Sequence, residues 1–292
     1  MSLQKYRALL KTIELGSISQ AAEQMGYTQP AVSRMIADLE REWNVELFRR
    51  NRSGLEISSV CQRLLPILRS IISDCEELEF TVGEFHGIQT GFVRVGTFTS
   101  VADMWIPGLL KSFQQKYPNV EFSLINMESY AEIEDSLRQG KIDCGFVRMP
   151  TTNDLETKFL MRDELVAVLP QNHPLVNEPV FSIDDFAKYP FIMIREKADY
   201  EVSHFLEGIP CKPTVLYEAS SDHTILSMVE SGLGVTITHS LIAQNPRYDV
   251  VCKPFSHRQY RDIAIATAKN TRITSATRLF IDHVCANIDT DK

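Results

Sequence analysis

A seven-residue apolar repeat over residues 60–85 constrains the fold of this 292-residue chain more than any other feature. One series is Leu64, Ile71, Leu78 and Phe85, and a second, offset by four, is Leu68, Cys75 and Val82. Two such series form the a and d seam of a coiled coil, so we predict a long helix that needs a partner helix. Pro66 either kinks this helix or lies near its start. The seam predicts a homodimer; the alternative is a long amphipathic helix packed on its own domain.

The residues before this repeat predict a helix-turn-helix. Gly26-Tyr27 breaks the chain, Thr28 is a suitable N-cap, and Pro30 fits a first helical turn. Apolar residues then recur at helical spacing and form one buried stripe: Val32, Met35, Ile36 and Leu39. The opposite face carries Gln29, Ser33, Arg34 and Ala37, of which Gln and Arg pair with base edges and Ser with phosphate. The alternative is an amphipathic helical hairpin whose polar face is merely solvated.

A basic turn between apolar flanks follows over residues 47–57. It resembles the wing of a winged helix, and Arg49, Arg50 and Arg52 place three arginines within four residues. We expect these arginines to contact phosphates or the minor groove of DNA.

From residue 91 onward, short apolar strands alternate with helical segments. The predicted strands are 92–95, 120–125, 142–147, 165–169, 191–194, 214–217, 235–238 and 263–268, with helices at 106–117, 132–139, 224–231 and 274–286. This alternation predicts parallel sheets covered by helices, and therefore an α/β fold. Residues 149–156, rich in Pro, Thr and Asn, are expected to cross between two lobes, and the chain is expected to return near residues 261–268.

Polar residues just beyond the predicted strands are the candidate ligand site, because open α/β sheets bind ligands at the carboxyl ends of strands. The candidates are Thr99, Ser100, Ser129, Arg148, Arg195 and His223. Hydroxyls with two arginines suit a small carboxylate or another anion. Singly, each residue has a simpler explanation: Thr99 and Ser100 as helix caps, and Arg148 as the partner of an acid such as Asp143.

No sequence motif of an enzyme is present: there is no G-x-S-x-G elbow, no phosphate-binding loop and no H-E-x-x-H helix. No His/Cys cluster has metal-ligand spacing, and the six cysteines are expected to be reduced thiols, with a redox-sensing pair as the alternative. We expect no catalytic residue, metal or cofactor. Neither a signal peptide nor a membrane-spanning run is predicted, so a cytoplasmic protein is expected. The competing hypotheses are a solute-binding receptor, which would need an export signal, and a small-molecule enzyme on the α/β half.

Several spaced motifs resemble the DNA-binding domain of LysR-type transcriptional regulators. In chain order they are Ser17-Ile18-Ser19-Gln20-Ala21-Ala22-Glu23, Thr28-Gln29-Pro30-Ala31-Val32-Ser33-Arg34, Asp38-Leu39-Glu40 and Leu47-Phe48-Arg49-Arg50. Residues 91–96, 107–118, 140–146 and 229–235 resemble the effector-binding domain of the same family, a two-lobed fold shared with periplasmic solute-binding proteins. Two positions depart from the family: Ile57-Ser58 with Val60-Cys61 after the wing, and Thr236-Ile237-Thr238-His239 where relatives usually carry a proline.

The resemblance implies an α/β chain with a winged helix-turn-helix over residues 1–58, a linker and dimerisation helix over 59–88, and an effector-binding domain over 89–292. Its lobe I is expected near 89–160 and 268–292, and its lobe II near 161–267. The residues expected to bind DNA are Ser17, Thr28, Gln29, Pro30, Ser33, Arg34, Arg50 and Arg52. The expected partners are operator DNA, a second copy in a homodimer or dimer of dimers, a small effector that includes anions, and RNA polymerase if the protein activates transcription.

The formal net charge of −8 argues against a nucleic-acid partner only if the chain is taken whole. Residues 1–58 hold eight basic and seven acidic side chains, whereas residues 59–292 hold twenty-two and thirty-one. The acidity therefore belongs to the part that is not expected to touch DNA. We expect modest non-specific affinity for DNA, with a salt dependence set by a few arginines in each half-site.

Overall fold

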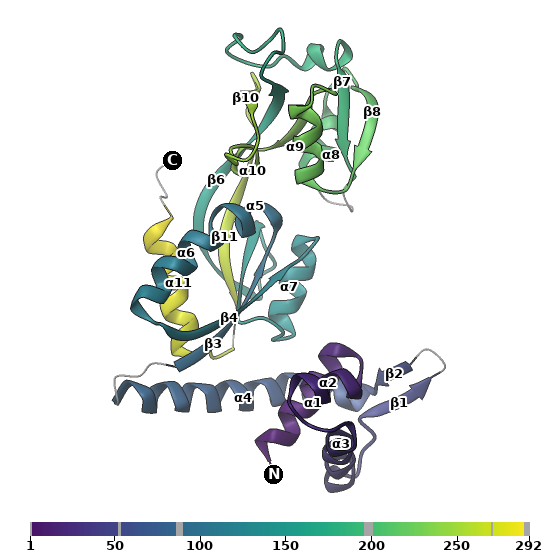
Figure 1. The fold of residues 1–292 in the computed structure, drawn as a ribbon, viewed down its shortest axis with the longest axis vertical. Coiled ribbons are helices and arrows are strands. Elements are labelled where there is room, and N and C mark those ends of the chain that lie inside the picture. The colour runs from purple at the N-terminus through teal and green to yellow at the C-terminus, as the bar shows by residue number, and fades with distance from the viewer. Residues whose placement is uncertain (1, 52–53, 86–89, 196–200, 270, 289–292) are drawn as a thin grey trace. The chain divides into compact units, whose positions relative to one another are not determined.

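The computed structural model describes residues 2–51, 54–85, 90–195, 201–269 and 271–288 (Figure 1). The chain divides into two compact units, residues 1–91 with 270–275 and residues 92–269 with 276–292. Within the described ranges, no helix is both long and apolar enough to span a membrane.

The first unit begins with three short helices and a hairpin. The elements are α1 (Leu3–Leu15), α2 (Ile18–Gln24), α3 (Gln29–Trp43), β1 (Phe48–Asn51) and β2 (Gly54–Ile57). Local sequence explains the boundaries: Gly16, with φ 62°, ends α1, and the Thr28 hydroxyl accepts the Ala31 N–H at 3.4 Å at the start of α3. Ala8, Ala22, Val32 and Ile36 form one core cluster between the three helices.

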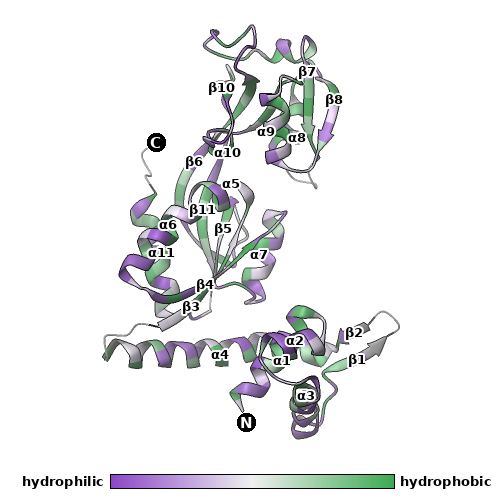
Figure 2. Ribbon diagram, in the orientation of Figure 1, coloured by the Kyte–Doolittle hydropathy of each residue, from purple (hydrophilic) through white to green (hydrophobic). Residues whose placement is uncertain are grey.

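The long helix α4 (Ser59–Phe85) completes the first unit and runs without a break through Pro66. It begins seven residues before that proline, because the Ser58 hydroxyl accepts the Cys61 N–H at 3.0 Å and caps the helix. One apolar face of α4 packs on the core beside α1 and α3, through Cys61, Leu65, Leu68 and Ile72. Apolar and polar residues alternate along the rest of the helix (Figure 2).

The second unit contains two lobes. Lobe I is built from β3 (Thr90–Thr97), α5 (Thr99–Met104), α6 (Ile106–Lys116), β4 (Asn119–Asn126), α7 (Tyr130–Arg138), β5 (Cys144–Met149) and α11 (Ser275–Asn287). Gly96 and Gly145 pair across β3 and β5, and a Cβ at Gly145 would lie 2.7 Å from Ile133 Cγ2. Glycine at this place therefore lets α7 pack closely on the sheet. The Phe113 ring meets the Phe280 ring at 5.6 Å, which holds α6 and α11 side by side (Figure 1).

The buried core of lobe II includes four phenylalanines, Phe181, Phe186, Phe191 and Phe255. Its elements are η1 (Ile183–Ala187), β7 (Pro190–Ile194), α8 (Glu201–Gly208), β8 (Thr214–Ala219), α9 (Asp222–Glu230), β9 (Thr236–His239), α10 (Ser240–Ala243) and β10 (Val250–Pro254). The parallel pair β7–β8 forms its own small sheet.

Two long strands, β6 (Leu155–Pro170) and β11 (Tyr260–Ala268), join the lobes (Figure 1). The strand order is β10-β6-β11-β5-β3-β4, with β9 also paired to β6. The expectation of parallel strands holds for β3 with β5 and for β7 with β8, but it is wrong for β11, which runs antiparallel to both β5 and β6. The reason is topological: β6 carries the chain out of lobe I, and β11 brings it back alongside.

Candidate functional sites

The exposed face of α3 is polar and its buried face is apolar, as the periodicity predicts. Val32 and Leu39 are completely buried and Ile36 nearly so, whereas Gln29, Pro30 and Arg34 are exposed and Ser33 is half-buried. The four predicted DNA-contacting residues of this helix therefore lie on or beside its free surface. Helix α3 packs on α2 across a short turn, which gives the geometry of a helix-turn-helix.

Ser17 and Thr28 act as helix caps in the structure. The Ser17 hydroxyl accepts the Gln20 N–H at 3.4 Å at the start of α2, just as Thr28 caps α3. Thr28 remains exposed beside Gln29, and Ser17 is half-buried. Both residues therefore lie at helix N-termini, where backbone N–H groups favour an anion such as phosphate.

The predicted wing is an antiparallel hairpin in which Phe48 pairs with Ile57 and Arg49 with Glu56. Arg49 is exposed. Arg50 lies in β1, but its side chain, and the whole of Arg52, lie outside the described residues. Sequence analysis named Glu40 within a family motif but predicted no role for it; in the structure its Oε1 accepts the N–H of Leu47 at 2.8 Å and of Phe48 at 3.4 Å. This carboxylate ties the wing to α3.

A buried arginine links the strands that join the two lobes. Arg261, at the start of β11, binds Asp163 on β6 through Nε at 3.0 Å and Nη2 at 2.7 Å. The same guanidinium donates to Ser100 Oγ and Tyr130 Oη in lobe I, both at 2.7 Å. Burial by itself lowers the pKa of Arg261, but Tyr130 and Asp163 outweigh burial and raise it. Ser100 is thus a partner of a protein cation rather than a free hydroxyl.

A second ion pair joins the lobes beside this network. Arg148 Nη1, at the end of β5, lies 3.2 Å from Glu201 Oε1 on α8, and the guanidinium lies over the Tyr130 ring at 5.5 Å. The predicted alternative partner of Arg148, Asp143, is instead paired with Arg94. Arg148 is therefore a lobe I cation that reaches lobe II.

Arg148 and Glu201 line a cavity of about 420 Å³ between β5 and the elements of lobe II. The cavity is also lined by Leu165, Ile183, His204, Phe205, Gly208, Ile209, His239, His257, Gln259 and Tyr260. Burial, together with the positive charges of Arg261 and Arg148, holds the pKa of His239 well below its usual value, so this imidazole is neutral. The cavity therefore combines one cation, one anion, one buried neutral imidazole and an apolar wall.

Of the six predicted ligand residues, only Arg148 lines this cavity. Thr99 begins α5, and Ser129 caps α7 by accepting the Glu132 N–H at 3.2 Å. His223 bridges the lobes elsewhere, with Nε2 2.7 Å from Asp103 Oδ2 and Nδ1 2.7 Å from the Tyr248 hydroxyl. Arg195 is 73% exposed and pairs with Glu218 at 2.9 Å, so the structure does not bring it to the cavity. Sequence reasoning missed Glu201 and His239, for which no motif signals a role.

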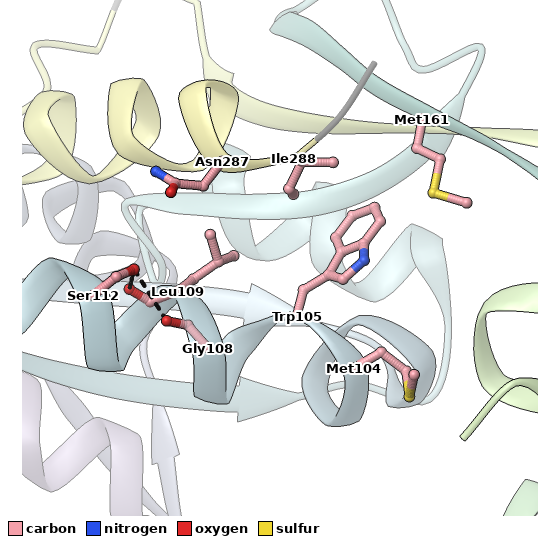
Figure 3. A pocket seen from close by; sticks show the side chains of 8 residues that line it. All are labelled: Met104, Trp105, Gly108, Leu109, Ser112, Met161, Asn287 and Ile288. Carbon is pink, nitrogen blue, oxygen red and sulfur yellow. Dashed lines mark hydrogen bonds between the residues drawn. The ribbon is translucent and has the colours of Figure 1, made fainter. Parts of the chain in front are cut away.

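A second hollow of about 370 Å³ lies in lobe I (Figure 3). Trp105 and Leu109 form one side, Ile288 and Asn287 the side of α11, and Met161 reaches in from β6 (Figure 3). The Ser112 hydroxyl in this hollow already donates to the Gly108 carbonyl at 3.0 Å. None of the described residues that line this hollow is charged, so they offer no cation to an anionic ligand.

The cysteines are free thiols, and Cys61 and Cys144 are buried. Burial raises the pKa of Cys61 and of Cys252 to about 11, which disfavours the reactive thiolate. Within the described part of the chain, no group of three His, Cys, Asp or Glu residues is placed to hold a metal ion.

Comparisons with known proteins agree with this two-part organisation. A family model described as the LysR substrate binding domain matches residues 86–288, and one for bacterial regulatory helix-turn-helix proteins of the lysR family matches residues 3–62. Among curated relatives, a probable transcriptional regulator, LrrA, of Synechococcus elongatus is 32% identical over 83% of this chain and 82% of its own. The uncharacterised regulator YvbU of Bacillus subtilis is 28% identical over 97% of both chains.

Two full-length structures share the fold. An OxyR variant from Pseudomonas aeruginosa is similar with a TM-score of 0.76 and 22% identity, covering 100% of this chain and 98% of its own. CbnR in complex with its target DNA is similar with a TM-score of 0.64 and 18% identity, covering 97% of this chain and 99% of its own.

Proposed function

Because the chain belongs to the LysR family of transcriptional regulators, we propose that α3 reads operator DNA, that α4 pairs two copies, and that a small molecule between the lobes controls the complex. The observation that carries the DNA-binding proposal is the exposed polar face of α3. Gln29, Pro30 and Arg34 are exposed on this face, whereas the opposite face of the helix is buried in the core of the helix-turn-helix. A solute-binding receptor or an enzyme would have no use for such a face.

In this proposal the N-terminal half of α3 enters the major groove. Gln29 and Arg34 pair with base edges, and the small side chains of Pro30 and Ser33 let the helix approach closely. Ser17 and Thr28 place helix N-termini near phosphates. Arg50 and Arg52 are proposed to grip the backbone or the minor groove from the wing.

Arg34→Ala tests the assignment of α3. We expect it to weaken operator binding by about 1–3 kcal/mol, roughly 5- to 150-fold, and to relax base preference at one position of each half-site. The measurement is fluorescence anisotropy on an operator first defined by footprinting, at fixed salt. Arg195→Ala is the matched control, because it removes an exposed arginine of lobe II and should leave DNA affinity unchanged. Unaltered affinity and sequence preference in Arg34→Ala would contradict the role.

The uncovered stripe of α4 supports the homodimer. Leu78, Val82 and Phe85 of the seven-residue repeat are 64%, 49% and 85% exposed, whereas Leu68 of the same repeat is buried within the first unit. Contiguous apolar residues exposed on a helix mark an association surface. A second copy of α4 on this stripe would pair two recognition helices, and such dimers could associate further into a dimer of dimers.

The cavity lined by Arg148 and Glu201 is the proposed effector site, since side chains of both lobes reach it. A ligand that binds one arrangement of the lobes better than another shifts the population toward that arrangement. The change would be read out as altered DNA binding, and as altered contact with RNA polymerase if the protein activates transcription. Thermal stabilisation by candidate metabolites, followed by operator binding with and without each hit, tests this part.

A further inference from the structure

We propose that the effector cavity takes a zwitterion, namely an amino acid with an apolar side chain, rather than a simple anion. This inference rests on the effector-binding function proposed above and names the chemical class of the ligand. It is carried by the charges, the unsatisfied polar atoms and the apolar wall of one cavity.

The two charged side chains of the cavity each have unused hydrogen-bonding capacity. Among the described residues, the Arg148 side chain makes a single hydrogen bond, from Nη1 to Glu201 Oε1, out of the five N–H groups that a guanidinium carries. Glu201 Oε2 is buried and has no hydrogen-bond partner in the described structure. A buried carboxylate oxygen without a donor is costly, so a ligand ammonium placed there relieves an existing penalty.

Among the described residues, Arg148 and Glu201 carry the main charges of the cavity. The Arg261 guanidinium behind it is matched by Asp163, with both side chains at most 6% exposed. His239 is 7% exposed and neutral, and its Nε2 is also without a partner in the described structure. His204 and His257 lie at the exposed rim. A cavity with nearly balanced charge favours a ligand with balanced charge.

A simple carboxylate fits this arrangement less well. It would bind Arg148 beside the Glu201 carboxylate, which pairs with the same guanidinium and would repel a second anion. It would also leave Glu201 Oε2 without a donor. An amino acid places its carboxylate on the free N–H groups of Arg148 and its ammonium on Glu201 Oε2, so both charges are met without breaking the existing pair.

The remaining wall specifies the side chain of the ligand. Leu165 and Ile209 are buried cavity residues, and Ile183 and Phe205 pack against the same lobe II core. The volume of about 420 Å³ lies within the range of small-molecule pockets and exceeds the need of a single carboxylate. An aliphatic or aromatic side chain would bury apolar surface on this wall.

Isothermal titration calorimetry of the full-length protein with three matched probes tests the class. The probes are L-leucine, 4-methylpentanoate, which lacks the amine, and 3-methylbutylamine, which lacks the carboxylate. L-isoleucine, L-valine, L-methionine and L-phenylalanine extend the amino-acid set. We expect at least one amino acid to bind, and its analogue lacking either charged group to bind at least tenfold more weakly.

Three variants locate the binding. Glu201→Gln should weaken amino-acid binding at least tenfold while improving binding of 4-methylpentanoate. Glu218→Gln is the control, because Glu218 of lobe II pairs with Arg195 away from the cavity, and it should change neither affinity more than twofold. Gly208→Phe is expected to block the cavity, because Gly208 lines it and a Cβ there meets no atom within 4 Å, so a ring can be added without a clash. If Glu201→Gln does not fold, the analogue series on the unmodified protein still decides the question.

The outcomes separate this inference from the proposed function. Binding of 4-methylpentanoate equal to or tighter than L-leucine, lost in Gly208→Phe, would overturn the zwitterion and keep the effector site. No binding by any of the five amino acids would also overturn the zwitterion. The proposed effector site is also refuted if, in addition, a wider panel of carboxylates and sugar phosphates contains no compound whose binding is lost in Gly208→Phe.

Discussion

Asp163→Ala should cost about 3–5 kcal/mol of the free energy of unfolding of the second unit. The Asp163 side chain is fully buried, and its Oδ2 accepts two hydrogen bonds from Arg261. Its Oδ1 accepts the Ser240 hydroxyl and the Leu241 N–H, both at 2.9 Å, and so holds the start of α10. Removal of the carboxylate leaves a guanidinium only 6% exposed without its counter-charge.

A paired substitution distinguishes the cost of an unpaired charge from loss of packing. Asp163→Leu combined with Arg261→Met removes both charges and keeps most of the buried volume. We expect the double variant to be more stable than Asp163→Ala by about 2 kcal/mol or more, because no buried charge is then left alone. It should remain below the unmodified protein, since Ser100, Tyr130 and Leu241 each lose a hydrogen-bond partner.

The two tryptophans allow the second unit to be followed alone. Trp43 lies in α3 and Trp105 in lobe I, so the Trp43→Phe background leaves one reporter, whose fluorescence is followed in urea. Asp262→Ala is the matched control: it breaks the neighbouring surface pair with Arg162 and should cost only a small fraction as much. The reasoning is refuted if Asp163→Ala costs less than about 1 kcal/mol, or if the double variant is no more stable than the single one.

Three further outcomes are expected. Leu78→Glu should convert the proposed dimer to a monomer, because it places a charge on the exposed apolar stripe of α4. The control Glu79→Gln, at an exposed neighbouring position, should leave the dimer intact. Light scattering measures the mass, and an unchanged mass in Leu78→Glu would contradict the dimer seam. His239→Gln should reduce the loss of folding stability at acid pH. The pKa of His239 in the folded protein lies below the unfolded value of 6.5, so the free energy of unfolding decreases as the pH falls below 6.5. The decrease is about 1.4 kcal/mol per pH unit and continues down to the folded-state pKa. Urea unfolding of both proteins at pH 7.5 and 5.5 measures this, and equal losses would exclude His239 as a cause. Burial raises the pKa of Cys61 and of Cys252 to about 11, so few of these thiols are ionised at pH 7.5. Both should therefore react with a thiol reagent far more slowly in the folded protein than in the unfolded chain. Rapid labelling of either residue would show that burial does not protect it.

Sequence patterns predicted the first unit well because its structure is local. The break at Gly26-Tyr27, the cap at Thr28 and the apolar stripe of α3 all act within a few residues, and the structure has each of them. Pro66 shows the limit of this reasoning. The helix does not start near the proline, as one of the two local expectations had it: α4 begins at Ser59 and continues through Pro66, where Leu65 and Leu68 pack on the core.

The second unit was predicted in its elements but not in their pairing. Strand β6 begins at Leu155, ten residues before the predicted strand 165–169, and β10 was not predicted. Half of β6 pairs with β11 and the other half with β9 and β10, so its burial pattern changes along its length. Antiparallel pairing of β11 with β5 follows from how the chain returns between lobes, which short-range periodicity does not report.

The amino-acid sequence by itself determined the helix-turn-helix, the apolar seam, the α/β class and one cavity residue, Arg148. Each depends on neighbours in the chain: caps, apolar spacing, or a position at a strand end. Only the tertiary structure decided that Ser100 accepts a hydrogen bond from Arg261, and that Glu201 pairs with Arg148. These pairs join residues 161 and 53 positions apart, and nothing in the local sequence sets which charges a fold brings together.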